Sequence, residues 1–197
     1  MLDVLVLISG SGSNLRALVD ATSNPEFPVR IVAVGSDTEA PGFSHAHERD
    51  IPTFVVDPRA FESRESWGDE LRSQIDAWNP DLVVCAGFMR ILPAGFVRAF
   101  TPNIINLHPA LLPLFPGAHA VRDALVAGVR ETGSTVHVVD EGVDTGPIIR
   151  QVAVAVDAGD DEASLHEKIK QIERPLLVET VGAIARGDIK LKELAST

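Results

Sequence analysis

Apolar residues in the first half of the chain fall into short runs that contain few polar positions. Runs of this kind, rich in valine and isoleucine, are typical of strands buried on both faces of a sheet. Each run is followed by a more polar stretch that leaves room for a helix. The pattern predicts strands over residues 2–8, 30–35, 53–56, 82–86 and 103–107.

The clearest helical pattern covers residues 63–78. One apolar face would carry four residues at helical spacing, Trp67, Leu71, Ile75 and Trp78. Asn79-Pro80 should end this helix, since proline disfavours the α conformation in the residue before it. Strands that alternate with helices predict an α/β fold, with a mostly parallel sheet and helices on both of its faces.

The pattern changes after the fifth predicted strand. Residues 108–117 are rich in proline and should form a loop, and a short helix is expected over 119–127. Two strands joined by a glycine-rich turn and then a long helix follow, over residues 135–140, 148–156 and 161–186. Since no repeat or interdomain linker interrupts the pattern, residues 1–197 are predicted to form a single domain.

Composition narrows the range of partners. The formal net charge is −11, which argues against nucleic acid because non-specific binding requires a basic surface. The single cysteine, Cys85, lies in an apolar run and is expected to be a buried core thiol. No apolar run reaches the length of a membrane span, and the first strand lacks the basic start of a signal peptide. We therefore expect a cytoplasmic protein without a membrane partner.

A glycine-rich loop, Ser9-Gly10-Ser11-Gly12-Ser13-Asn14, follows the first strand and opens a helix. Free amides and the positive end of a helix dipole favour an anion there, so the loop predicts a phosphate site, with a plain tight turn as the alternative. Leu15 stands where a dinucleotide fingerprint has its third glycine, although Asp37 follows the second strand as a ribose-binding acid would. A nicotinamide dehydrogenase is therefore a rival interpretation.

Asn106 and His108 lie at the end of the fifth predicted strand, where parallel sheets bind ligands. Residues two apart on a strand point to the same face, so both side chains could reach one reacting atom. The amide can donate to an oxyanion, and the imidazole can give or take a proton. Asp144, in the second glycine-rich turn, would orient His108 and stabilise its cation if it lies beside it. A turn residue at the surface is the alternative for Asp144.

Four segments occur in the order and spacing of a known family. They are residues 8–15, 86–92 (Ala-Gly-Phe-Met-Arg-Ile-Leu), 106–113 (Asn-Leu-His-Pro-Ala-Leu-Leu-Pro) and 142–148 (Gly-Val-Asp-Thr-Gly-Pro-Ile). On these motifs the chain resembles the folate-dependent phosphoribosylglycinamide formyltransferases of purine biosynthesis, along almost its whole length. The resemblance implies a Rossmann-like formyltransferase fold. It also implies transfer of a formyl group from 10-formyltetrahydrofolate, a co-substrate, to the amine of glycinamide ribonucleotide.

The resemblance also implies site residues and partners. The catalytic set would be Asn106, His108 and Asp144, and the ribonucleotide would contact Gly12, Ser13, Asn14 and Glu173. The folate would contact Arg64, Met89, Arg90, Ile91, Leu92, Asn106, Asp140, Glu141, Gly142, Val143 and Asp144, and His119 and His137 would play supporting roles. The ribonucleotide site would lie in the N-terminal half and the folate and catalytic residues in the C-terminal half. No metal is implied, and family members can self-associate as homodimers.

Several positions depart from the commonest family pattern. Ala110 replaces a frequent serine, Leu114-Phe115 replaces a frequent Lys-Tyr pair, and Pro175 is expected to kink the C-terminal helix. His45 and His47, two residues apart, should face different sides of a helix and are predicted as surface residues rather than metal ligands. Methionyl-tRNA formyltransferase, formyltetrahydrofolate deformylase and a non-catalytic binding protein are the remaining alternatives.

Overall fold

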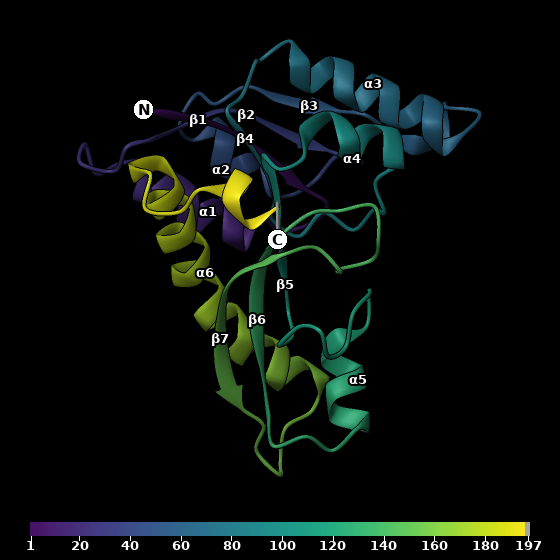
Figure 1. The fold of residues 1–197 in the computed structure, drawn as a ribbon, viewed down its shortest axis with the longest axis vertical. Coiled ribbons are helices and arrows are strands. Elements are labelled where there is room, and N and C mark those ends of the chain that lie inside the picture. The colour runs from purple at the N-terminus through teal and green to yellow at the C-terminus, as the bar shows by residue number, and fades with distance from the viewer. Residues whose placement is uncertain (196–197) are drawn as a thin grey trace.

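The structure is a computed structural model that describes residues 1–195, and the strands of these residues form one seven-stranded sheet in the order β3-β2-β1-β4-β5-β6-β7 (Figure 1). The strands are β1 (Leu2–Ile8), β2 (Val29–Ser36), β3 (Thr53–Val55), β4 (Leu82–Cys85), β5 (Ile104–His108), β6 (Glu131–Val138) and β7 (Ile148–Ala155). The helices are α1 (Ser13–Ala21), α2 (Phe43–His47), α3 (Arg64–Asp76), α4 (Ala94–Phe100), α5 (Ala120–Val126), α6 (Glu162–Arg186) and α7 (Leu191–Leu194), with a 3-10 turn η1 (Pro58–Ala60).

Strands β1 to β5 pair in parallel, whereas β6 and β7 pair antiparallel with their neighbours. This confirms the predicted α/β class and the mostly parallel sheet. Strand β5 continues past the end of β4: Cys85, the last residue of β4, pairs with Asn106, and His108 pairs only with Thr135 of β6. The end of β5 is therefore open on the β4 side, and ligands bind parallel sheets at such strand ends.

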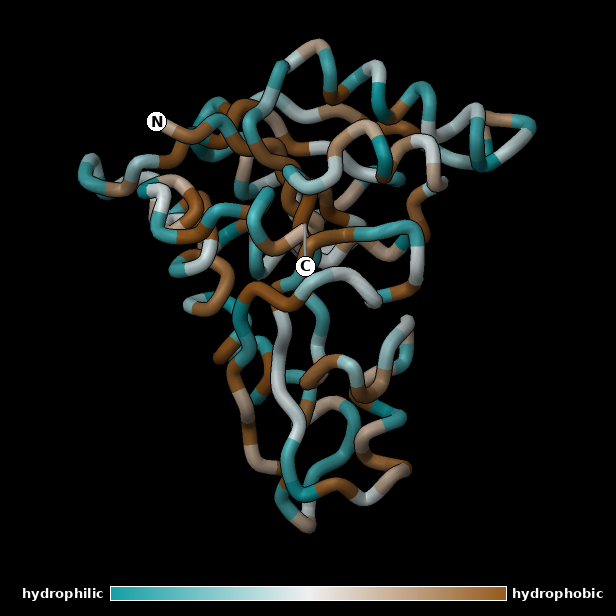
Figure 2. Tube along the Cα trace, in the orientation of Figure 1, coloured by the Kyte–Doolittle hydropathy of each residue, from teal (hydrophilic) through white to brown (hydrophobic). Residues whose placement is uncertain are grey.

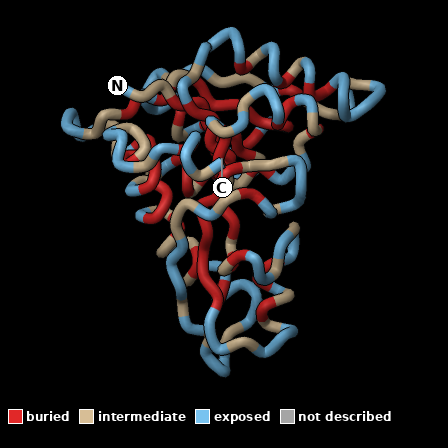
Figure 3. Tube along the Cα trace, viewed as in Figure 1, coloured by how far each residue is buried: buried red, intermediate tan, exposed pale blue. Residues whose placement is uncertain are grey.

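Helices cover both faces of the sheet, because the apolar side chains of β1 point alternately to one face and to the other. Val4, Val6 and Ile8 belong to a core cluster that they share with α1, α2, α6 and α7. Leu5 and Leu7 point to the other face and join a cluster with α3 and α4. Figure 2 shows hydrophobic residues gathered on the central strands, and Figure 3 shows these strands buried.

The C-terminal helix α6 is 25 residues long and continues past Pro175, so this proline does not end the helix. It begins beside α5 and β6 in the narrow lower part of Figure 1 and ends beside α1 in the broad upper part. Asp161 caps its first turn, and Gly187 ends it in the left-handed conformation. No helix within residues 1–195 is long and apolar enough to cross a membrane.

Two expectations for individual elements were wrong. Trp78 lies beyond the end of α3 and is exposed, because the helix ends at Asp76. Strand β6 begins at Glu131 rather than at residue 135, and residues 132–134 are buried and paired with β7. Gly133 is required there, since a Cβ atom would collide with the Val152 carbonyl. The short helices α2, α4 and α7 have too few residues for a clear periodic pattern.

Candidate active site

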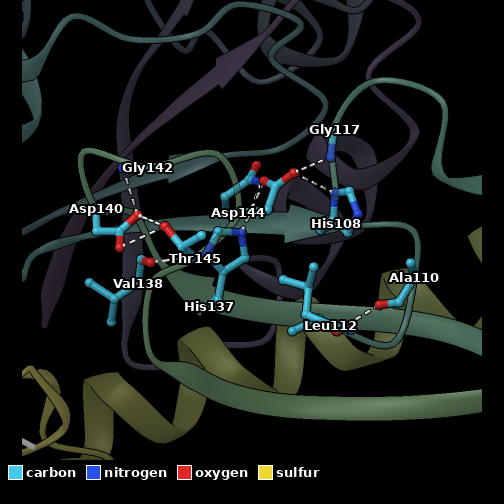
Figure 4. A network of polar contacts seen from close by, with 12 residues as sticks. His108, Ala110, Leu112, Gly117, His137, Val138, Asp140, Gly142, Asp144 and Thr145 are labelled. Carbon is cyan, nitrogen blue, oxygen red and sulfur yellow. Dashed lines mark hydrogen bonds and ion pairs between the residues drawn. The ribbon is translucent and has the colours of Figure 1, made fainter. Parts of the chain in front are cut away.

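His108 lies between two hydrogen-bond acceptors. Its Nδ1 atom lies 3.3 Å from Asp144 Oδ2 (Figure 4). Its Nε2 atom lies 2.8 Å from the carbonyl oxygen of Phe115. The ring is buried, and each of its nitrogens faces an acceptor oxygen. Both Phe115 and Asp144 have positive φ, 55° and 54°, so two left-handed turns direct these acceptors toward His108.

Asp144 is tied to the residues around it by four contacts. Gly117 N donates to Oδ2 at 2.8 Å, and Asn106 Nδ2 donates to Oδ1 at 3.4 Å. His137 Nε2 lies 3.5 Å from Oδ1, and His108 completes the set. Burial by itself raises the pKa of Asp144, but hydrogen bonds with His137 and the Gly117 amide, together with the charges of the two histidines, lower this pKa to about 2. Asp144 is therefore a carboxylate at neutral pH.

The turn that carries Asp144 has a fixed shape. Thr145 Oγ1 donates to the carboxylate of Asp140, and Gly142 N donates to Asp140 Oδ1 at 3.1 Å (Figure 4). Glycine is needed at position 146, because a Cβ atom would collide with the Val138 carbonyl. The turn therefore folds back on β6 and brings Asp144 over Asn106 and His108, which sequence spacing alone could not establish.

His137 is the buried neighbour of Asn106 on β6. Its Nδ1 atom lies 2.9 Å from the Val138 carbonyl, so Nδ1 carries the hydrogen. Its Nε2 atom lies 3.2 Å from Asn106 Nδ2 and 3.5 Å from Asp144 Oδ1. His137 therefore lies between the Asn106 amide and the Asp144 carboxylate.

The glycine-rich loop, residues 9–14, is joined through Glu173 to the strand that carries Asn106 and His108. Gly12 is the N-cap of α1 with φ of 69°, and Asn14 Nδ2 donates to Glu173 Oε2 at 3.2 Å. Glu173 Oε1 lies 3.4 Å from Ser134 Oγ, and this hydroxyl donates to the His108 carbonyl at 3.1 Å. The loop and the Asn106–His108 segment are thus parts of one connected region.

A cavity of about 250 Å³ opens over Asn106, His108 and Asp144. Segment 87–92 forms one wall, and Asp140, Gly142, Val143 and Asp144 form another, with Asn106, His108 and His137 between them. A second cavity adjoins it across Met89, Arg90 and Ile91 and is lined on its far side by Arg64 and Trp67. The mostly apolar first cavity with a few convergent polar groups has the character of a ligand site.

Comparisons with known proteins point to one family. The family described as formyl transferase matches residues 2–181. The chain is 50% identical to phosphoribosylglycinamide formyltransferase of Mycobacterium tuberculosis over 182 residues, 92% of this chain and 84% of the relative. The enzyme of the same name from Escherichia coli is 39% identical over 196 residues, 99% of this chain and 92% of the relative. The crystal structure of glycinamide ribonucleotide transformylase 1 from Symbiobacterium toebii superposes with a TM-score of 0.92 at 40% identity, covering 95% of this chain and 89% of that one.

The chain belongs to the phosphoribosylglycinamide formyltransferase family. This confirms the resemblance and the enzyme class predicted from the four motifs. Asp37, which a dinucleotide-binding interpretation would assign to a ribose, is buried and accepts a hydrogen bond from Arg90 Nε at 2.6 Å. Asp37 therefore no longer supports the dehydrogenase alternative.

The folate residues expected from the formyltransferase family are divided between the two cavities. Met89, Arg90 and Ile91 contribute to both, Leu92 lines the first, and Arg64 lines the second. Glu141 is the exception in the 140–144 turn, since its carboxylate pairs with Arg98 at 2.9 Å outside the cavity. His119 lies exposed just before α5, and it does not line either cavity.

Three features of this family member could not be read from its sequence. The Phe115 carbonyl contacts His108 only because the backbone reverses at Phe115. Asp37 holds Arg90 from a different strand end. His45, predicted at the surface, is half buried, and its Nε2 atom lies 3.2 Å from the Ser11 carbonyl of the glycine-rich loop. His47 is exposed, as predicted. No local pattern signals any of these contacts.

Cys85 is buried beside the cavity, and burial raises its pKa to about 12. A thiol in this state is a poor nucleophile, in line with the predicted core role. Among residues 1–195, no three His, Cys, Asp or Glu side chains gather closely enough to bind a metal ion.

Proposed function

We propose that the enzyme transfers the formyl group of 10-formyltetrahydrofolate to the amine of glycinamide ribonucleotide, a step of purine biosynthesis, in the cytoplasm. The observation that carries the proposal is the convergence of Asn106, His108 and Asp144 at one side of the 250 Å³ cavity. Two donors and a carboxylate around one point suit a reaction that creates an oxyanion and moves a proton. The partners are small molecules, and no step passes through a metal.

The proposed reaction begins when the amine lone pair attacks the formyl carbon. The carbonyl π bond opens, and the oxygen of the tetrahedral intermediate becomes an oxyanion that Asn106 and His108 stabilise by hydrogen bonds. Their present contacts with Asp144, 3.4 and 3.3 Å, are long and can be exchanged for stronger ones to this oxygen. Catalytic hydrogen bonds commonly tighten in this way once the ligand is bound.

Collapse of the intermediate breaks the bond between the formyl carbon and the folate nitrogen. The attacking amine must lose a proton and the departing nitrogen must gain one, so the reaction balances without an outside acid or base. Asp144 takes part as the carboxylate through which this proton passes, with a water molecule as the relay. Alignment of both substrates over one cavity supplies the proximity contribution.

The two substrates occupy different regions in this proposal. Gly12, Ser13 and Asn14 bind the phosphate through backbone amides at the start of α1, and Glu173 lies on the ribose and amine side. The folate occupies the two adjoining cavities, with its pterin along residues 89–92 and 140–144 and its acidic tail toward Arg64. The overall charge of −11 makes such local groups necessary for binding anions.

The test is an absorbance assay of 10-formyltetrahydrofolate consumption, with and without glycinamide ribonucleotide, on the wild type and on His108→Ala. We expect consumption that requires the ribonucleotide and collapses in the variant. Consumption without the ribonucleotide would indicate a deformylase instead. Folded protein that consumes no donor would exclude formyl transfer and favour a binding protein.

A further inference from the structure

The glycine-rich loop turns its carbonyl groups toward the protein. Gly10 O accepts a hydrogen bond from Gly42 N at 3.0 Å, and Gly12 O accepts one from Arg16 N at 2.8 Å. Between them, Ser11 O lies 3.2 Å from His45 Nε2. Within residues 1–195, the amides of Gly10, Ser11 and Gly12 donate to no protein acceptor. The loop therefore presents amides outward only because its carbonyls are held inward.

We propose that His45 is a positioning residue for the ribonucleotide, which holds the Ser11 carbonyl away from the phosphate. The inference rests on the proposed function of the loop as the phosphate site. The Gly10 and Gly12 carbonyls are held by backbone amides, whereas the Ser11 carbonyl is held by a side chain. A carbonyl oxygen that turned toward a phosphate would place two negative groups together and weaken binding.

Packing around His45 supports this role independently. A Cβ atom on Gly12 would lie 3.0 Å from Gly42 Cα and 3.5 Å from His45 Cδ2. A Cβ atom on Gly42 would lie 2.9 Å from both Gly10 O and Gly12 Cα. The start of α2 is therefore seated directly on the loop, and the imidazole fills the space beside Gly12.

The second ring nitrogen of His45 shows what orients the ring. Nδ1 is buried and has no hydrogen-bond partner within the described part of the chain. A buried acceptor without a partner is destabilising, so the ring would turn if another orientation satisfied it better. The Ser11 carbonyl is therefore the one hydrogen-bond partner that the ring has within the described part of the chain.

Two substitutions of equal length separate the hydrogen bond from the packing. In His45→Gln, the amide nitrogen is as many bonds from Cβ as Nε2 is in histidine, so it can still donate to Ser11 O. His45→Met has the same reach without a donor. We expect His45→Met to raise KM for glycinamide ribonucleotide about tenfold, and His45→Gln to raise it less than about threefold, as loss of one hydrogen bond predicts.

The kinetic pattern and a control on the same helix make the test specific. In His45→Met, kcat and KM for the folate donor should remain within about twofold of wild type, because only uniform binding of one substrate is lost. His47→Met is the control, since His47 is exposed and contacts Thr53 rather than the loop. Thermal melting checks that each variant is folded, and His45→Ala replaces His45→Met if the latter does not fold.

The outcomes distinguish this inference from the proposed function. Wild-type enzyme whose donor consumption does not depend on the ribonucleotide would overturn the proposed function before any variant is measured. Active wild type with equal ribonucleotide KM values for the Gln and Met variants would overturn the positioning role alone. The positioning role would also be overturned if His45→Met raised KM for the folate donor as much as KM for the ribonucleotide. The substitution would then disturb the whole site rather than one substrate.

Discussion

The carboxylate of Glu173 lies 3.2 Å from the side-chain amide of Asn14, although 159 positions separate the two residues in the chain. Glu173 is 5% exposed, and its polar contacts are the neutral groups of Asn14 and Ser134. Burial raises its pKa, and these hydrogen bonds offset only part of the rise. The junction between the glycine-rich loop and the catalytic strand therefore contains a carboxyl group that resists ionisation.

We expect Glu173→Gln to stabilise the fold at neutral pH. A carboxyl with a raised folded pKa contributes its stability below the unfolded value of 4.5 and loses it as pH rises through the folded value. The glutamine avoids that loss, so its melting temperature should exceed wild type by a few degrees at pH 7, at roughly 2–4 °C per kcal/mol, and match it near pH 4. Glu179→Gln, an exposed position on α6, should show no such trend. A gain that is equal at both pH values would contradict the explanation.

Asp144→Asn should abolish most activity while preserving the fold. The asparagine oxygen can still accept from Gly117 N, but the carboxylate that carries the proton is gone. We expect kcat to fall roughly 10²–10⁴-fold, the usual range for loss of an acid–base group. Steady-state kinetics would measure this, with Asp76→Asn on the exposed side of α3 as the control. A fall of less than about tenfold would remove Asp144 from the proton path.

The lowered pKa of Asp144 means that this carboxyl group does not become protonated in mildly acidic solution. A carboxyl with a depressed folded pKa contributes stability above its unfolded value of 3.8 and loses it as pH falls toward about 2. Asp144 therefore stays ionised throughout the range from pH 5 to 8. If the rate falls on the acid side of this range, the pH at which it falls should be the same in wild type and in Asp144→Glu. The comparison uses the residual turnover of the variant. If the fall in rate moved to a different pH in Asp144→Glu, the titrating group would be Asp144 itself, which would contradict the prediction.

Asn106→Ala should impair turnover far more than binding. It removes one of two donors to the proposed oxyanion, and loss of one such donor typically lowers kcat about 10²–10³-fold. Titration calorimetry with a non-reactive folate should show affinity within about fivefold of wild type, since the oxyanion exists only during reaction. Asn103→Ala, exposed just before β5, supplies the control. Equal losses in affinity and kcat would mean that Asn106 acts mainly in binding.

The Asp37–Arg90 pair should respond unequally to removal of either partner. Asp37 is 4% exposed and one of its oxygens has no partner within residues 1–195, whereas the Arg90 side chain is half exposed. Arg90→Met leaves a buried carboxylate alone and should destabilise the fold by roughly 1–3 kcal/mol, whereas Asp37→Asn leaves a cation that can turn to water. Urea unfolding of both variants and of the double variant tests this. Equal destabilisation by the two substitutions would contradict the burial argument.

Features set by local pattern could be predicted from the sequence. The buried runs of β1 and β4 and the spacing of Asn106 and His108 required only periodicity, and the helix after the glycine-rich loop required only its motif. Strand β6 was predicted four residues too short, because burial of Thr-Gly-Ser depends on β7, which lies beside it.

Contacts between distant segments could not be predicted in this way. The place of Asp144 over His108 depends on a turn that folds back on β6, and only the family resemblance supplied it at the sequence level. Nothing along the chain pairs Asp37 with Arg90 or His45 with Ser11, since each contact joins the ends of different strands or helices. Such contacts are consequences of tertiary packing, which the sequence encodes only collectively.

The length of α6 has a consequence for the candidate site. At about 1.5 Å per residue, its 25 residues make roughly 38 Å of helix, which packs on α1 at one end and on α5 at the other. Glu173 lies near the middle of this helix, between the loop at α1 and the strand that carries His108. One helix therefore connects the glycine-rich loop at α1 with the strand that carries His108, and its length sets the span between these two regions.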